Sequence, residues 1–243
     1  MTTFLDPVAL DFLWESLDAG ELPYPLAARS HGETMDQRRV LRNRVFEVLR
    51  ERRMLDQQGR IAPQIEDWLT LLARGTHSVD AVLEGKTALA AGDGHQALLA
   101  TQTDEGLTLT RIDPSAVVSS VVALLPPCPR GTEKSITVPS AELTRMAEGR
   151  PAGATAIDRQ VLKALSEQPK QRAGQLAVNT RSPMGTRKRS QVVSWFDTPS
   201  GRYLTYTRKG QDGTDWITIA PADAATLRHH LGELLTKLTD GRP

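Results

Sequence analysis

The stretch Val192–Leu204, VVSWFDTPSGRYL, alternates apolar and polar side chains with a period of two on both sides of a turn. A period of two sends successive side chains to opposite faces of a sheet and is typical of a strand. The acid, proline and glycine of Asp197–Gly201 favour a tight turn, and Arg202–Thr207 resumes with aromatic and β-branched residues. We therefore predict a β-hairpin. Either one of the rings of Trp195 and Phe196 faces the core and the other faces solvent or a partner, or both rings are core.

Apolar residues recur at helical spacing in the first part of the chain. Leu5–Leu17 has apolar side chains three and four residues apart, with Asp6 placed as N-cap and a proline at the first helical position. Two further helices are predicted at Thr34–Leu55 and Ile61–Gly75, packed on each other. Between the first two helices, Leu22–Arg29 contains two prolines, so we expect an extended segment at a sheet edge or strand start.

The remaining elements follow from the same two periods. Small side chains dominate residues 85–94 and predict only a connection, and glycines predict a break at 149–153. Besides the hairpin, the predicted strands are 77–83, 96–102, 107–112, 135–138, 174–179 and 215–219, and the predicted helices are 139–148, 157–165, one starting at Asp113 and one starting at Pro221.

Two halves of the chain repeat one order of elements, which is a strand, helices, strands and a final helix. Apolar positions also match at a spacing of 110 residues, as between Leu107 and Ile217. We therefore predict an internally duplicated α+β protein with a pseudo-twofold axis and a central antiparallel β-sheet flanked by two helical bundles. In this interpretation residues 1–243 form a single domain, with halves at about 1–127 and 132–240 joined by a Pro-rich linker at 126–131.

Composition narrows the classes of function. The 243 residues include 30 basic and 29 acidic side chains, and the formal charge of +1 argues against a dedicated polyanion binder. No apolar run approaches the ~20 residues that span a bilayer. The first residues lack the basic and apolar blocks of a signal peptide, so we expect a cytoplasmic protein without a membrane span.

Motifs for catalysis or metal binding are missing from the sequence. It contains no glycine-rich phosphate loop, nucleophile elbow, paired-histidine metal spacing or CxxC motif. Cys128 is the lone cysteine, and the neighbouring His229 and His230 point in different directions on a predicted helix. We therefore expect that the protein is not an enzyme and binds no cofactor, metal or small-molecule substrate.

Several short motifs occur in order along nearly the whole chain. They are Leu13-Trp14, GELP at 20–23, SHG at 30–32, VVALLP at 121–126, SWFDT at 194–198 with GRYL at 201–204, and WITIAPAD at 216–223. Together they resemble the EspG family of cytoplasmic chaperones of type VII secretion in actinobacteria, and the string ending in GRYL is the most specific of them.

The resemblance implies a function and a region of contact. EspG-like proteins bind the apolar helical tip of the PPE protein in a PE–PPE heterodimer, keep that tip from self-associating and direct the pair to its secretion system. The C-terminal bundle and adjoining sheet make the contact. In this sequence the implied client-binding residues are Leu176, Val178, Arg181, Arg187, Val192, Trp195, Leu231 and Leu235.

The alternative function is nucleic-acid binding. Residues 34–72 are compatible with a helix-turn-helix whose first helix carries seven arginines between 38 and 53, with the basic cluster 187–189 as a second contact. The nearly neutral overall charge argues against it, as do Glu66 and Asp67 on the helix that would enter a groove. Residues 182–190 offer no apolar anchor, and we expect them to be mobile in the free protein.

Overall fold

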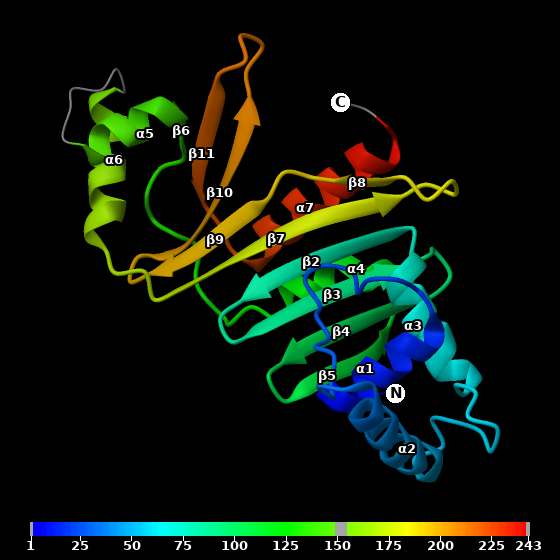
Figure 1. Cartoon of the computed structure of the whole chain (residues 1–243). Coiled ribbons are helices and arrows are strands. Elements are labelled where there is room, and N and C mark those ends of the chain that lie inside the picture. The colour runs from blue at the N-terminus through cyan, green and yellow to red at the C-terminus, as the bar shows by residue number, and fades with distance from the viewer. Residues whose placement is uncertain (1, 149–154, 242–243) are drawn as a thin grey trace. The chain divides into compact units, whose positions relative to one another are not determined.

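The computed structural model describes residues 2–148 and 155–241, which form two compact units (Figure 1). The first unit comprises Met1–Val121 and Asn179–Lys188, and the second comprises Val122–Val178 and Arg189–Pro243. Both combine helices with antiparallel strands, so the predicted α+β class is confirmed. The break expected at 149–153 lies outside the described residues.

The first unit has one long antiparallel sheet and helices on both of its faces. Its elements are β1 (Thr2–Leu5), α1 (Pro7–Leu17), α2 (Met35–Glu51), α3 (Pro63–Arg74), β2 (His77–Leu83), β3 (Lys86–Gly92), β4 (Ala97–Thr103), β5 (Gly106–Ile112) and α4 (Val117–Val122). The strand order is β1-β5-β4-β3-β2, followed by the C-terminal end of β7 (Arg172–Arg181). Leucines and alanines of β3, β4 and β5 pack with α1 and α3, whereas Gly92 faces Val117 of α4 on the opposite side.

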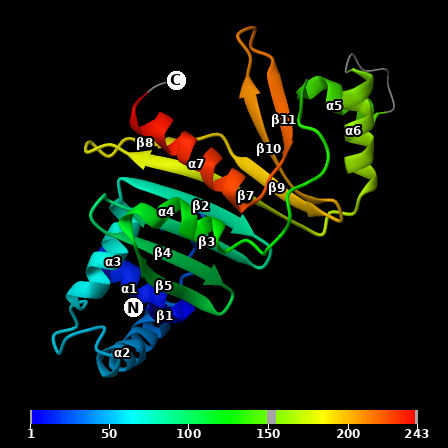
Figure 2. The ribbon, with the colours of Figure 1, turned by 180° about the vertical axis from the view of Figure 1, so that it is seen from behind.

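The second unit repeats this plan. Its further elements are β6 (Ile136–Pro139), α5 (Ser140–Ala147), α6 (Ala156–Glu167), β8 (Arg187–Arg189), β9 (Val193–Thr198), β10 (Gly201–Lys209), β11 (Asp215–Pro221) and α7 (Ala224–Thr239). The strand order is β6-β11-β10-β9-β7, and β8 pairs with β7. Tyr203 of β10 packs with α6, whereas Tyr206 stacks on His230 of α7. Because side chains of a strand alternate between faces, α6 and α7 lie on opposite faces of this sheet. Figure 2, which views the molecule from behind, shows the face that α7 covers.

The two units share one topology. In each, the first strand pairs with the last, and the three remaining strands follow in reverse chain order. Asp113 and Asp223, which are 110 residues apart, both accept a hydrogen bond from a backbone amide at the start of the helix that follows the last strand. Val121 and Leu231 are both fully buried. These matches support the internal duplication. The duplication, the division into two halves and the linker between them remain predictions.

Local sequence explains most element ends. The carboxylate of Asp6 accepts a hydrogen bond from the amide of Ala9 at 2.8 Å, so α1 begins where the cap and the proline predict. Thr34 caps α2 in the same way. The predicted hairpin is confirmed as β9 and β10, with Leu204 opposite Trp195.

Three segments differ from the sequence-based expectation. The sequence predicts neither β1 nor β3, although β3 lies in the region 85–94 expected to be a connection. Residues 22–29 lie outside the described strands, and the side chain of Gln102 binds the backbone of Ala27 there: its Oε1 accepts from the Ala27 amide at 2.8 Å. The expected mobility of residues 182–190 stays a prediction; residues 182–186 of this segment form the turn between β7 and β8, with the Ser182 amide donating to the Thr186 carbonyl at 2.9 Å.

Candidate functional site

The predicted hairpin is built around a buried ion pair. Nε of Arg202 donates to Oδ1 of Asp197 at 2.7 Å, and Nη2 donates to Oδ2 at 2.9 Å. The guanidinium carbon of Arg202 lies 4.6 Å from the centre of the Trp195 ring. Arg172 adds a second cation, with its Nε 3.1 Å from Oδ2 of Asp197. Asp197 and Arg202 are 0% and 1% exposed, so the string that resembles EspG most closely is core.

This ion pair fixes the segment 126–131. Nη2 of Arg202 donates to the Pro126 carbonyl at 2.8 Å, and the amide of Arg202 donates to the Pro129 carbonyl at 2.9 Å. A side chain at Gly131 would meet the ring of Tyr203 at 2.3 Å, so only glycine fits there. Burial, together with the Asp197 carboxylate, raises the pKa of the Cys128 thiol, which disfavours a reactive thiolate.

The eight residues expected to bind a client fall into two groups. Four are core residues: Leu176, Val178 and Leu231 are 0% exposed, and Trp195 is 2% exposed. Val178 therefore does not face outward, and a charge there would disrupt the fold instead of probing a surface. Phe196, next to Trp195, is only partly buried and stacks on Tyr203 with ring centroids 5.6 Å apart.

The other four residues are accessible. Val192 is 37% exposed, and Leu235 is partly exposed on α7. Arg181 and Arg187 belong to the first unit, where Nη1 of Arg181 and Nη2 of Arg187 donate to the Ala73 carbonyl at 2.7 and 3.4 Å.

An incompletely covered apolar stripe continues along the C-terminal half of α7. Leu227 and Leu231 of this helix are fully buried, but Leu234, Leu235 and Leu238 in the same register are only partly buried. We call these three residues the α7 stripe. The spacing of the leucines predicts that they share one face of the helix, but the sequence does not show where the underlying sheet stops covering that face.

Aromatic residues of the same unit lie on the face of the sheet that α7 covers. The ring of Tyr206 stacks on His230 with centroids 4.6 Å apart, and Arg208 lies 5.6 Å from the centre of the Tyr206 ring. Trp216, opposite Arg208 on β11, is 36% exposed. Burial, followed by the positive charges of Lys237, Arg208 and His229, lowers the pKa of His230, and Glu233 opposes that shift.

A family model for the EspG family matches residues 6–233 of the chain. The chain belongs to the EspG family. No curated protein matches it. EspG proteins are chaperones associated with type VII secretion, which assigns this general role to the chain.

The helices α2 and α3 of this EspG-family protein do not form the helix-turn-helix of the alternative function. Residues 52–62 separate them, where a helix-turn-helix has a turn of about 3–4 residues. One face of α3 is buried through Trp68, Leu69 and Leu72, and its exposed face carries Glu66 and Asp67, which phosphates would repel.

A second Asp–Arg pair attaches α2 to α1 in this EspG-family protein. Nη1 and Nη2 of Arg38 donate to the two carboxylate oxygens of Asp11 at 2.9 and 3.0 Å. The amide of His31 donates to the same carboxylate at 2.8 Å. Burial raises the pKa of Asp11, but the hydrogen bonds from Arg38 and His31 outweigh it, and the pKa is lowered overall. The SHG motif therefore includes a residue that fixes its loop to α1.

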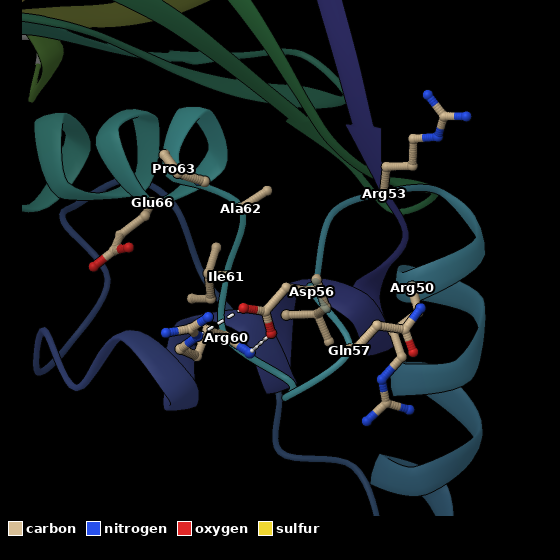
Figure 3. A pocket seen from close by; sticks show the side chains of 10 residues that line it. Arg50, Arg53, Asp56, Gln57, Arg60, Ile61, Ala62, Pro63 and Glu66 are labelled. Atoms are coloured by element: carbon tan, nitrogen blue, oxygen red, sulfur yellow. Dashed lines mark hydrogen bonds and ion pairs between the residues drawn. The ribbon is translucent and has the colours of Figure 1, made fainter.

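Figure 3 shows a pocket of about 640 Å³ at the junction of α2 and α3 in the first unit. Its lining mixes cations and anions, but Arg60 is bound to Asp56 through Nε at 2.6 Å, and Arg53 points away from the other side chains. The charges do not converge on one point, so the pocket presents no catalytic constellation.

Residues 2–148 and 155–241 contain neither a candidate metal site nor a candidate membrane span. No three His, Cys, Asp or Glu side chains of these residues lie close enough together to hold a metal ion. No helix within them has the length and hydropathy needed to cross a membrane.

Proposed function

We propose that this chain binds the apolar helical tip of a PPE protein in a PE–PPE heterodimer, keeps that tip from self-associating and directs the pair to its type VII secretion system. The proposal places this activity in the cytoplasm and requires no cofactor. Membership in the EspG family supports it, and the α7 stripe carries it, because three leucines in register are left partly uncovered on a secretion-associated chaperone.

The energetics suit a releasable complex. Burial of apolar surface contributes roughly 25 cal/mol per Å², and a standard interface covers about 800 Å² on each partner. A helical tip placed on the α7 stripe removes both apolar surfaces from water. The exposed His229 and Lys237 of the same helix would then form part of a polar rim.

In this proposal some of the predicted contact residues touch the client, and others support the surface from within the core. Leu235 and Val192 contact the client directly, joined by Leu234, Leu238 and Trp216. Leu176, Val178, Trp195 and Leu231 form the buried layer that supports this surface. The resulting site has an apolar centre on α7, and its members all belong to the second unit.

The test is binding of a recombinant PE–PPE heterodimer, measured by size-exclusion chromatography with light scattering. We expect a one-to-one complex with the wild-type chain, because the apolar tip is one discrete surface. Leu235→Glu should lower the affinity by at least tenfold, which corresponds to about 1.4 kcal/mol, since it places an unpaired carboxylate in the interface.

Thr236→Glu is the matched control, because it adds the same charge one residue away on the exposed side of α7. It should bind the heterodimer as the wild-type chain does. Absence of any complex with the wild-type chain would refute the proposed function. Equal binding by the Leu235→Glu and Thr236→Glu proteins would refute the placement of the site on α7.

A further inference from the structure

Residues 181–189, RSPMGTRKR, form a preorganised basic hairpin, which we call the basic hairpin. The segment contains four basic and no acidic side chains. Its turn is closed by hydrogen bonds from the Gly185 amide to the Ser182 carbonyl at 2.8 Å and from the Ser182 amide to the Thr186 carbonyl at 2.9 Å. Gly185 has φ +84°, a left-handed conformation that glycine adopts without strain. The tip therefore has a defined shape.

Two of its arginines fix the base of the basic hairpin. Arg181 and Arg187 both donate to the carbonyl of Ala73, in the last turn of α3. Carbonyl groups at a helix C-terminus carry partial negative charge, so cations are stabilised there. These two side chains are thus engaged within the first unit, in spite of their expected role as client contacts.

Two other side chains of the basic hairpin are accessible, one in β8 and one in the turn. Lys188 is exposed, and Met184 is 95% exposed. An exposed methionine on an ordered turn, in a segment whose charged side chains are all positive, combines an adaptable apolar anchor with a field of one sign. This combination fits a surface that is acidic around an apolar depression.

We propose that the basic hairpin binds an acidic patch on the PE–PPE client, with Met184 inserted into an apolar depression of that patch. This inference rests on the proposed function and names the chemistry of a second contact. The hairpin speeds association through charge attraction, whereas the α7 stripe retains the bound client by burial of apolar surface.

The charge count favours an acidic protein over the other polyanions. Proteins that bind DNA through its backbone commonly make about 6–10 phosphate contacts, and basic segments that bind anionic lipid carry about 4–8 cations. The basic hairpin has four, and two of these are bound to Ala73. A second copy of the same hairpin would be repelled, because like charges would face each other.

The experiment measures association and dissociation rates of the full chain with a recombinant PE–PPE heterodimer at low and high salt. Lys188→Glu should slow association by about 3–10-fold at low salt, and the difference should shrink at high salt, where screening weakens steering. Met184→Ser should raise the dissociation rate a few-fold with little change in the salt dependence. Lys134→Glu is the matched control, because it makes the same charge change at an exposed position in the second unit, and should associate at the wild-type rate.

Three results would overturn the inference. The first is equal association rates for the Lys188→Glu and Lys134→Glu proteins while the wild-type chain binds the heterodimer, which leaves the proposed function intact. The second is a loss of affinity for duplex DNA or for anionic phosphatidylglycerol vesicles in Lys188→Glu with unchanged client rates, which would reassign the hairpin to that polyanion. The third is a wild-type chain that binds no PE–PPE heterodimer, which would refute the proposed function as well.

Discussion

The two units contain Asp–Arg pairs with the same construction but different access to solvent. Arg38 with Asp11 and Arg202 with Asp197 are both bidentate, and each guanidinium carbon lies 4.6 Å from the centre of an aromatic ring. Each arginine also donates to a backbone carbonyl of a connecting segment, namely that of His31 at 3.0 Å or of Pro126 at 2.8 Å. Their side chains differ in exposure, at 16% and 9% for Arg38 and Asp11 but 2% and 0% for Arg202 and Asp197.

This difference decides what each pair contributes. When an ion pair that water can reach is broken, water hydrates the separated charges. The loss in free energy of unfolding is then little more than the contribution of the pair's own hydrogen bonds. A fully buried pair leaves an unpaired charge in the core when one partner is removed. With the same Asp–Arg geometry, we therefore expect the loop of the SHG motif to detach more easily than the segment 126–131.

The largest expected effect comes from breaking the buried pair. Asp197→Ala leaves the positive charge of the Arg202 guanidinium in the core without a carboxylate beside it, although Nη2 keeps its hydrogen bond to the Pro126 carbonyl, and it should reduce the free energy of unfolding by about 3–5 kcal/mol. Urea unfolding and thermal melts measure it, since each kcal/mol lowers Tm by about 2–4 °C at this chain length. The double substitution of Asp197→Leu with Arg202→Met should recover much of the loss. A single-variant loss below about 1 kcal/mol would show that water hydrates the unpaired guanidinium.

The accessible pair should give a smaller and more local effect. Asp11→Ala removes the partner of Arg38 and of the His31 amide, and should cost about 1–3 kcal/mol. Amide hydrogen exchange should accelerate for the 30–38 segment and the first turns of α2, while β9 and β10 stay protected. Asp56→Ala, which breaks the exposed pair with Arg60, is the control and should leave exchange in 30–38 unchanged. If Asp11→Ala instead lost protection against hydrogen exchange throughout the protein, the Asp11–Arg38 pair would contribute to global stability as the Asp197–Arg202 pair does.

The contrast also explains which parts of the fold could be predicted from the sequence. The hairpin of Asp197 and Arg202 follows from a local period and a turn, and α1 follows from the cap at Asp6. The carboxylate partners of Arg38, Asp11 and Glu15, are 27 and 23 residues away along the chain, so no local pattern identifies them. For the same reason the sequence could not show that the resembling motifs SWFDT and GRYL hold a connecting segment.

Burial on both faces of a strand explains why the sequence did not show that some predicted contact residues lie in the core. Leu176, Ala177 and Val178 of β7 are all 0% exposed, so alternation there does not distinguish a core face from an outer one. In β3, alanines and a glycine replace the β-branched residues that usually mark a strand, because helices approach closely on both sides. The α7 stripe could be seen as a leucine register, but its partial exposure depends on where the sheet ends.

The smallest expected effect is a difference in the pH at which the two units lose stability. Burial lowers the pKa of His230, so the folded protein keeps it neutral while the unfolded chain protonates it below about pH 6.5. Stability should therefore fall as pH decreases from about 7 towards 5, by at most about 1.4 kcal/mol per pH unit for this one proton. The pKa of Asp11 is lowered instead from that of an ordinary carboxyl, so the stability that it contributes persists above about pH 4 and is lost only as pH falls further, through its folded pKa. The packing of α7 on Tyr206 should thus weaken at a higher pH than the attachment of α2.

His230→Phe keeps the stacking on Tyr206 and should flatten the dependence of stability on pH between pH 7 and 5. The part of this dependence that is due to His77 should remain, because burial lowers the pKa of His77 as well. Thermal melts at closely spaced pH values measure both slopes, with His229→Phe as the control, because His229 is exposed. An unchanged slope in His230→Phe would mean that the imidazole is hydrated in the folded state and that α7 is no more acid-sensitive than the rest of its unit.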